Sequence, residues 1–430
     1  MNTRWMTGAV AAAALLMVAA CGGGGGGSPG NDSSQGTTAG GSTPSTTPGG
    51  TTPSTTTGGT TRSTTPGETP STTPGGTTQP PTNTTPTLAA ATPVVDGTTL
   101  GAAQWSDGST ATGGAGQAVS NLNCAIAGNK YSYAHLSVYQ NGKQLALPAN
   151  IGTIAPTMAR QTGCVYPVHT VDASGKIRMD VTSNASYTLG QFFSVWGQPL
   201  STTNVAGITG DVTAWVNTGG TLTKYTGDLA SLVLPQHGEV TLVIGTAPAQ
   251  IATYTWTDPP PFTPTVTTLS YGGVVGTSFW ADGNTATGGT GATVDGLICA
   301  AGMAETFHVH SHVAIFKDGQ WLAFPKNVGI LQQCNYETHT HDNTGIIHIE
   351  TPNMKNFTLG QVFDIWGQPL SSTNVAGITG NIVIYINDNG DVRRYTGDPR
   401  NIPLTSLRDI TFQIGTPLTT LPTYSWYEPQ

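Results

Sequence analysis

The chain contains the same long segment twice, and this internal repeat dictates how it must be divided into domains. Thr188–Gly210 reads TLGQFFSVWGQPLSTTNVAGITG, Thr358–Gly380 reads TLGQVFDIWGQPLSSTNVAGITG, and the two differ at four positions. The motif Trp105-Ser-Asp-Gly is matched in the same way by Trp280-Ala-Asp-Gly. Solenoid repeats are only about 20–50 residues long, so a repeat of this length predicts two copies of a whole domain.

We expect five regions along the chain. Residues 1–20 form a signal peptide, 21–93 a tether, 94–258 the first module, 259–266 a linker and 267–430 the second module. The linker opens with three consecutive prolines, which favour a stiff and extended backbone. Each module is long enough to bury a hydrophobic core of its own.

The N-terminus has the features of an export signal. Arg4 precedes an apolar stretch, Ala9–Ala20, which is too short to span a bilayer comfortably and ends in Val18-Ala19-Ala20-Cys21. This ending resembles the lipobox of bacterial lipoproteins. The resemblance covers only the start of the chain, and it implies that Cys21 is acylated and anchors the mature protein in a lipid bilayer. Because Gly22 is not an acidic retention signal, it favours the outer membrane or the cell surface as the site within the cell envelope.

The segment that follows the lipobox consists almost entirely of Gly, Ser, Thr and Pro. Such a composition cannot bury enough apolar surface to offset the chain entropy lost on folding. We therefore expect a disordered tether between the anchor and the modules. Composition alone leaves open whether its Ser and Thr side chains carry sugars.

The charge of the chain excludes one class of partner. Charged residues make up 9% of the sequence and the net charge is −8. Nucleic-acid binding and polybasic membrane attachment both require clustered Lys and Arg, so neither is expected. No segment after the signal peptide has the length of a transmembrane helix. The composition does not indicate an oligomeric state.

The cysteines predict one disulfide in each module. Apart from Cys21, the chain has four cysteines, and they fall at matching places in the two copies. Exported proteins experience oxidising conditions, which favour disulfides over thiolate metal ligands. The expected pairs are Cys124 with Cys164 and Cys299 with Cys334.

The folded part is predicted to be mainly β, a β-rich α+β class with one short helix in each module. Apolar alternation and flanking turn signals favour strands over Val313–Lys317, Trp321–Phe324, Gly345–Glu350, Asn381–Ile386 and Ile410–Gly415. A helix should begin after Thr358 as N-cap, place Leu359, Val362, Phe363 and Trp366 in the core, and end at Gly367. The pattern does not distinguish a β-sandwich from a barrel-like module.

Histidines are concentrated in the second module. Six of the nine lie between His308 and His348: His308, His310, His312, His339, His341 and His348. Residues i, i+2 and i+4 of a strand share one face, so the first three should project together. A symmetric turn at Asp342–Gly345 would place His339 opposite His348, with Cβ atoms about 4.5–5.5 Å apart. These six histidines are the candidate ligands of one Zn²⁺ or Cu²⁺ ion, with Glu337, Asp342 and Glu350 as candidate partners that orient them. Asp342 also fits a turn role.

The first module supplies an internal control. The residues that correspond to the six histidines, in order, are Tyr131, Tyr133, His135, His169, Val171 and Arg178. The scaffold is retained while four of the six histidines are replaced, so the fold does not require them. Because an arginine stands at a ligand position, we expect no metal in the first module.

These features favour a tethered metal-binding lipoprotein that captures, buffers or delivers Zn²⁺ or Cu²⁺. The two modules contain neither HExxH nor GxSxG, which favours binding over catalysis. A metal-dependent hydrolase or redox enzyme using His310, His339 and His341 is one alternative. A surface module that binds an envelope protein or a glycan is another. Imidazole ligands predict release of the metal as the pH falls past about 6.5. The segment His339-Thr-His-Asp with the following TLGQ helix is similar to histidine-rich domains of exported bacterial proteins, a likeness that implies no particular activity.

Overall fold

The computed structural model describes residues 85–155, 163–181, 185–302 and 306–426. The predicted signal peptide, Cys21 and most of the tether lie outside the described residues. Within the described residues, both modules belong to one compact unit.

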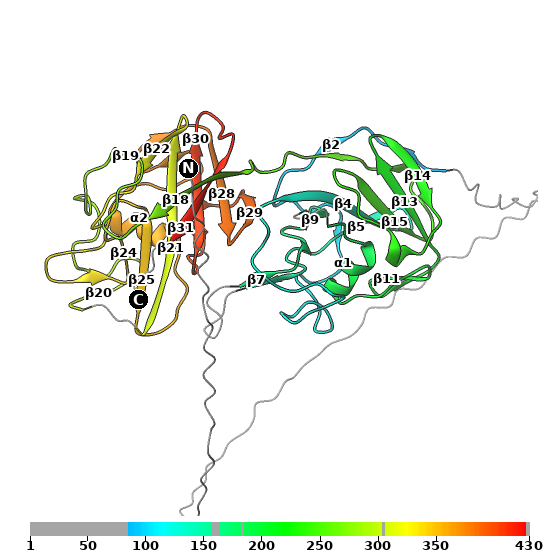
Figure 1. Cartoon of the computed structure of the whole chain (residues 1–430), viewed down its shortest axis with the longest axis horizontal. Coiled ribbons are helices and arrows are strands. Elements are labelled where there is room, and N and C mark those ends of the chain that lie inside the picture. Colours follow the sequence, from blue (N-terminus) through cyan, green and yellow to red (C-terminus); the bar gives the residue numbers. More distant parts are fainter. Residues whose placement is uncertain (1–84, 156–162, 182–184, 303–305, 427–430) are drawn as a thin grey trace, which may run out of the picture. The chain divides into compact units, whose positions relative to one another are not determined.

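Each module is built on one mixed β-sheet, and the two sheets have the same strand order (Figure 1). In the first module the order is β14-β13-β15-β4-β5-β3, and β9 and β8 extend it from β4. The strands are β3 (Ala102–Ala103), β4 (Tyr131–Gln140), β5 (Lys143–Ala146), β8 (Val168–His169), β9 (Lys176–Asp180), β13 (Val212–Thr218), β14 (Thr221–Tyr225) and β15 (Glu239–Ile244).

In the second module the order is β29-β28-β30-β21-β22-β19, extended from β21 by β25 and β24. The strands are β19 (Thr277–Ser278), β21 (Phe307–Lys317), β22 (Gln320–Ala323), β24 (Thr338–His339), β25 (Ile346–Thr351), β28 (Ile382–Asp388), β29 (Asp391–Tyr395) and β30 (Arg408–Ile414). Both sheets end in edge strands and neither closes into a barrel. The prediction of two tandem, mainly β modules is therefore confirmed.

The described residues also form short strands and two 3₁₀ turns. They are β1 (Thr87–Leu88), β2 (Thr92–Pro93), β6 (Thr153–Ile154), β7 (Cys164–Val165), β10 (Leu200–Ser201), β11 (Asn204–Val205), β12 (Ile208–Thr209), β16 (Gln250–Ile251), β17 (Tyr254–Thr255), β20 (Cys299–Ala300), β23 (Asn335–Tyr336), β26 (Asn374–Val375) and β27 (Ile378–Thr379), with 3₁₀ turns at Leu229–Ser231 and Pro399–Asn401.

Parallel strand pairs lie at the start and end of each module. β18 (Phe262–Leu269) pairs with β31 (Leu421–Trp426), while β1 pairs with β16 and β2 with β17. The predicted linker 259–266 thus becomes strand from Phe262 onward. The segment predicted as tether already contributes strands from Thr87.

One helix packs on each sheet, as the sequence predicted: α1 (Leu189–Trp196) and α2 (Leu359–Trp366). At the start of α2 the backbone N–H of Thr358 donates to Gln361 Oε1 at 2.9 Å. Gly367 ends the helix with φ 82°, a left-handed conformation that glycine adopts without a Cβ penalty. Trp366 is fully buried, in agreement with its predicted core role.

The two faces of the second sheet have different chemistry because strand β21 alternates. Val309, Val313 and Ile315 point toward α2 and join the hydrophobic core around Trp366. The histidines of β21 alternate with these residues and so lie on the opposite face. The helix therefore fixes which face of the sheet carries the histidines.

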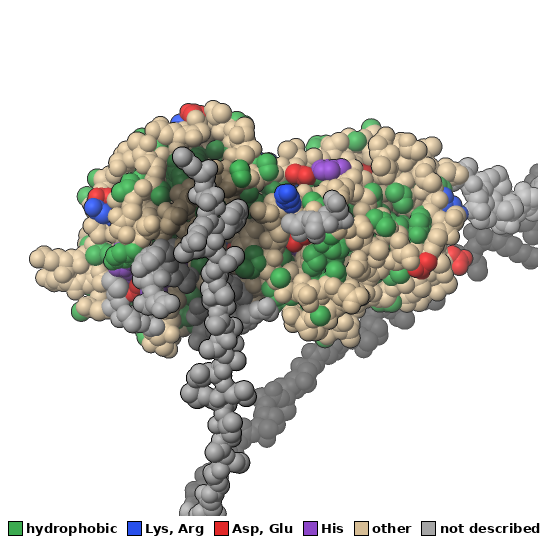
Figure 2. Space-filling view, viewed as in Figure 1, with side chains coloured by type: hydrophobic (Ala, Val, Ile, Leu, Met, Phe, Trp, Pro, Cys, Tyr) green, Lys and Arg blue, Asp and Glu red, His purple; other side chains and the backbone are tan. Residues whose placement is uncertain are grey.

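Both predicted disulfides are present, Cys124–Cys164 and Cys299–Cys334. Among the described residues, none of the helices is long and apolar enough to cross a membrane. Figure 2 shows the charged side chains scattered over the visible face of the described residues rather than gathered into a basic patch.

Candidate metal centre

Three adjacent strands bring three histidines into one row. His310 on β21 pairs with His348 on β25, and His348 pairs with His339 on β24. Directly opposed residues in antiparallel strands have neighbouring side chains. The predicted pairing of His339 with His348 across the Asp342 turn is thus confirmed.

His308, His341 and Glu350 extend this row into a cluster. Glu350 is the strand partner of His308, and His341 follows β24 two residues after His339. We call these six residues the histidine cluster: His308, His310, His339, His341, His348 and Glu350. Within the cluster, only the side chains of His308, at 29% exposure, and His341 are more than marginally accessible to solvent.

The distances between ring nitrogens in the cluster are similar to those between the ligand atoms of a metal site. His310 Nε2 lies 3.0 Å from His348 Nδ1, His308 Nε2 lies 3.4 Å from the same atom, and His339 Nε2 lies 3.2 Å from His341 Nε2. Bonds of about 2.1 Å in a tetrahedral zinc site place neighbouring ligand atoms roughly 3.4 Å apart. The cluster can therefore hold a metal ion without a large rearrangement.

His339 shows how the scaffold orients a ligand. Its Nδ1 donates to the backbone carbonyl of Tyr336 at 2.9 Å, which leaves the Nε2 lone pair directed toward His341. Metal-binding histidines are commonly held in this way by a hydrogen bond on the other ring nitrogen. The same contact occurs in the first module, where His169 Nδ1 donates to Tyr166 at 2.7 Å.

Glu350 brings a buried carboxylate to the cluster. Its Oε1 lies 3.2 Å from His308 Nε2, 3.6 Å from His348 Nδ1 and 3.7 Å from His339 Nε2. Its Oε2 is buried and, among the described residues, has no hydrogen-bond partner. An unpaired carboxylate oxygen in a buried site costs free energy. A bound cation would remove this cost.

Four histidines of the cluster, His310, His339, His341 and His348, are kept neutral. Burial, with repulsion from neighbouring imidazoles, lowers the pKa of His310 and of His348 to about 3. Burial lowers the pKa of His339 to about 4, although the charge of Glu350 opposes this shift, and it also lowers the pKa of His341. Neutral imidazole is the form that binds metals, so the site is ready for a cation at neutral pH.

His312, a predicted ligand, lies apart from the cluster. Its Nδ1 is 3.1 Å from Asp409 Oδ1, and its Nε2 donates to the carbonyl of Thr344 at 3.0 Å. The ring of Tyr424 packs against it with centroids 4.4 Å apart. Because both nitrogens are already engaged, His312 belongs to neither group of metal-ligating side chains that the structure brings together.

Two of the three acidic residues that were predicted to orient the histidines make their hydrogen bonds to other residues. Glu337 accepts hydrogen bonds from Ile298 N, from Thr351 Oγ1 and from Lys355 Nζ, so it ties neighbouring segments together. Asp342 accepts from the backbone N–H groups of Thr344 and Gly272, which is a turn role. Only Glu350 reaches the histidines.

The matching place in the first module is occupied by a carboxylate from the second. Asp391, at the start of β29, is fully buried and lies 3.1 Å from His169 Nε2 and 3.7 Å from Arg178 Nε. Arg178 Nη2 also donates to the carbonyl of Gly390 at 3.0 Å. Burial opposes ionisation of Asp391, but the charges of His169 and Arg178 outweigh it and hold its pKa below the usual range. Nothing in the local sequence of the hairpin between β28 and β29 indicates this contact.

In its first module the chain therefore uses an ion pair where its second module has imidazoles. Arg178 Nη1 donates to Asp180 at 2.9 Å, and its guanidinium lies 4.6 Å from the centroid of the Tyr131 ring. Groups of three or more ligands within reach of one ion occur, among the described residues, only in the second module.

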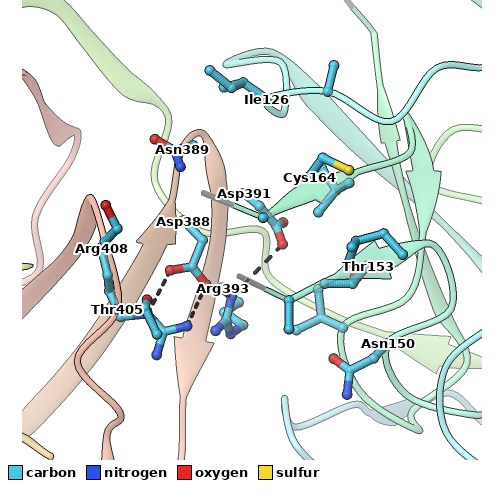
Figure 3. A pocket seen from close by; sticks show the side chains of 17 residues that line it. Ile126, Asn150, Thr153, Cys164, Asp388, Asn389, Asp391, Arg393, Thr405 and Arg408 are labelled. Carbon is cyan, nitrogen blue, oxygen red and sulfur yellow. Dashed lines mark hydrogen bonds and ion pairs between the residues drawn. The ribbon is translucent and has the colours of Figure 1, made fainter. Parts of the chain in front are cut away.

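A cavity of about 300 Å³ lies beside the Asp391 contact (Figure 3). Ile126 and Cys164 line one side, and the hairpin residues Asp388 and Asp391 line the other. Asp388 is paired with Arg408 through a 2.7 Å hydrogen bond. The lining contains no histidine, so this cavity is separate from the candidate metal centre.

We expect the variant Asp391→Ala to be less stable than the parent by about 3–5 kcal/mol. Removal of Asp391 leaves buried His169 Nε2 without its partner and leaves Asp180 as the remaining carboxylate beside the buried charge of Arg178. Urea unfolding of both chains measures the difference. The control is Asp282→Ala, since the pair between Asp282 and Lys326 is exposed and such pairs contribute about 1 kcal/mol or less. Equal losses in the two variants would contradict a stabilising role for Asp391.

Comparisons with protein-family models, with curated proteins and with solved structures found no match to this chain. The functional argument therefore rests on the geometry of the histidine cluster.

Proposed function

We propose that this protein is an exported, lipid-anchored metal-binding protein of the cell envelope. Its second module would bind Zn²⁺ or Cu²⁺ through the histidine cluster, for capture, buffering or delivery. The observation that carries the proposal is the set of five imidazoles, three of them buried, gathered around a buried carboxylate whose Oε2 has no hydrogen-bond partner among the described residues. Imidazole and carboxylate donors suit both ions, and no thiolate belongs to the cluster.

Export and anchoring have separate support. Both modules contain a disulfide, which is typical of proteins that fold in an oxidising compartment. The likeness of Val18–Cys21 to a lipobox supports acylation at Cys21 and attachment to a bilayer. A metal-binding body attached to the bilayer through Cys21 would stay close to the membrane.

The metal content of the purified intact chain tests the proposal. After dialysis, elemental analysis should find at least one equivalent of zinc or copper in the parent. The double variant His339→Ala/His341→Ala should lose metal, because it removes two imidazoles whose Nε2 atoms lie 3.2 Å apart. His237→Ala in the first module is the control, since its side chain is 60% exposed and outside the cluster. A parent chain that takes up neither ion above micromolar affinity would rule out the proposal.

A metal-dependent enzyme is the second candidate. Two histidines and a glutamate, the donor set of His339, His341 and Glu350, are found in catalytic zinc sites, where a fourth position is left for water. The partial exposure of His308 and His341 would give a substrate a route to the ion. Spectroscopy of the cobalt-substituted chain distinguishes the two functions, because an ion with four protein ligands and no exchangeable water would exclude catalysis.

A further inference from the structure

The histidine cluster contains more donors than one ion of the expected kind can use. It offers five imidazoles and one carboxylate, whereas zinc in proteins is usually four-coordinate. One ion would therefore leave two buried side chains without a ligand role. An octahedral ion with bonds of about 2.1 Å would require all six donor atoms to lie within roughly 4.2 Å of one another. The donors instead form two groups, each within 4.8 Å, that share only His348.

The six donors can be assigned to two sets of three. In the first set, His348 Nδ1 lies 3.0 Å from His310 Nε2 and 3.4 Å from His308 Nε2. In the second set, His339 Nε2 lies 3.2 Å from His341 Nε2 and 3.7 Å from Glu350 Oε1. Three histidines, or two histidines with one glutamate, are both complete ligand sets of known zinc sites.

Glu350 links the two sets. Its Oε1 lies 3.2 Å from His308 Nε2 in the first set and 3.7 Å from His339 Nε2 in the second. Its Oε2 is the buried oxygen without a partner among the described residues. A carboxylate that reaches two cations can bind one with each oxygen and offset part of their mutual repulsion.

We propose that the second module binds two metal ions side by side. His308, His310 and His348 would hold one, His339 and His341 would hold the other, and Glu350 would bridge them. This inference rests on the proposed function, and it replaces the single ion that the sequence predicts. With Glu350 bridging, the first ion would have four protein ligands and the second ion three, so the second ion would keep an open position for water or a small anion.

The first module supplies substitutions that test each set separately. His310→Tyr and His341→Val introduce the residues found at the matching positions, Tyr133 and Val171, which the same scaffold already accommodates. We expect the intact parent chain to bind two equivalents of Cu²⁺ or Zn²⁺ and each variant to bind one. His308→Ala is a second variant of the first set. Because the His308 side chain is partly exposed, its removal should leave the module folded.

Electron paramagnetic resonance of the copper-loaded chain reports the proximity of the ions. In the parent, the signal of isolated Cu²⁺ should weaken as the second equivalent binds, because neighbouring spins couple. The single-set variants should keep an uncoupled signal. A parent that saturates at one equivalent would overturn the two-ion inference and leave the proposed function standing. A folded single-set variant that binds no metal would also overturn it, and a parent without metal would overturn both proposals.

Discussion

The variant His348→Arg is expected to lose metal binding altogether. His348 belongs to both groups of ligands, and its ring lies 4.4 Å from the rings of both His310 and His341. Arginine has no lone pair to offer and stays protonated at any ordinary pH. Two unit charges 4 Å apart repel by about 4 kcal/mol at an effective dielectric constant of 20. Such a repulsion weakens affinity by about a thousandfold, before the loss of the ligand itself is counted.

Competition with a chromogenic chelator measures this loss. The parent and His348→Arg are titrated under the same conditions, with circular dichroism to show that both are folded. The reciprocal variant Arg178→His is the matched control. It restores an imidazole in the first module but should not create a site, because Tyr131, Tyr133 and Val171 still replace the other histidines. Parent-like affinity in His348→Arg would show that the cluster is not the metal centre.

The local parts of this site could be predicted from the sequence. Strand alternation put His308 and His310 on one face, and the turn chemistry of Asp342–Gly345 set the register that pairs His339 with His348. Helix α2 was equally local, since Thr358 and Gly367 delimit it. In each case the residues that determine the structure lie within a few positions of one another.

His312 shows where this reasoning ends. Strand alternation places His312 on the same face as His310, but it does not show which residues of other strands pack against His312. Asp409 and Tyr424 come from β30 and β31, about a hundred residues away, and their contacts engage its ring. Glu337 was misplaced for the same reason, because Lys355 and Thr351 draw it away from the histidines. A single sequence does not reveal such tertiary partners.

Asp391 illustrates the same limit between the two copies. The sequence shows that Arg178 stands where the second module has His348. It does not show that a carboxylate from the second module would lie beside that arginine and His169. A buried guanidinium requires an anion beside it. The arginine that replaces a ligand histidine and the carboxylate of Asp391 that lies beside it are therefore physically linked.

Acidification is expected to destabilise the metal-free chain strongly between about pH 6.5 and pH 4. The pKa of His310 and of His348 is lowered to about 3 and that of His339 to about 4, whereas an unfolded histidine titrates near 6.5. Within this window the unfolded chain binds more protons than the folded chain, so stability falls as the pH falls. Each such histidine contributes about 1.4 kcal/mol per pH unit until the folded-state pKa is reached.

Metal should shift this loss to lower pH. A coordinated imidazole nitrogen cannot accept a proton, so protons must displace the ion first, and their binding to the buried ring is already unfavourable. The release near pH 6.5 that the sequence alone suggests is therefore expected to occur closer to pH 4. Thermal unfolding of metal-free and metal-loaded chains between pH 7 and pH 4 measures both effects. His310→Tyr should show a shallower decline when metal-free, because it removes one titrating group. Equal stability of the metal-free parent at pH 7 and pH 4.5 would show that the fold does not keep His310, His339 and His348 neutral. The lowered pKa values would then no longer support a metal site.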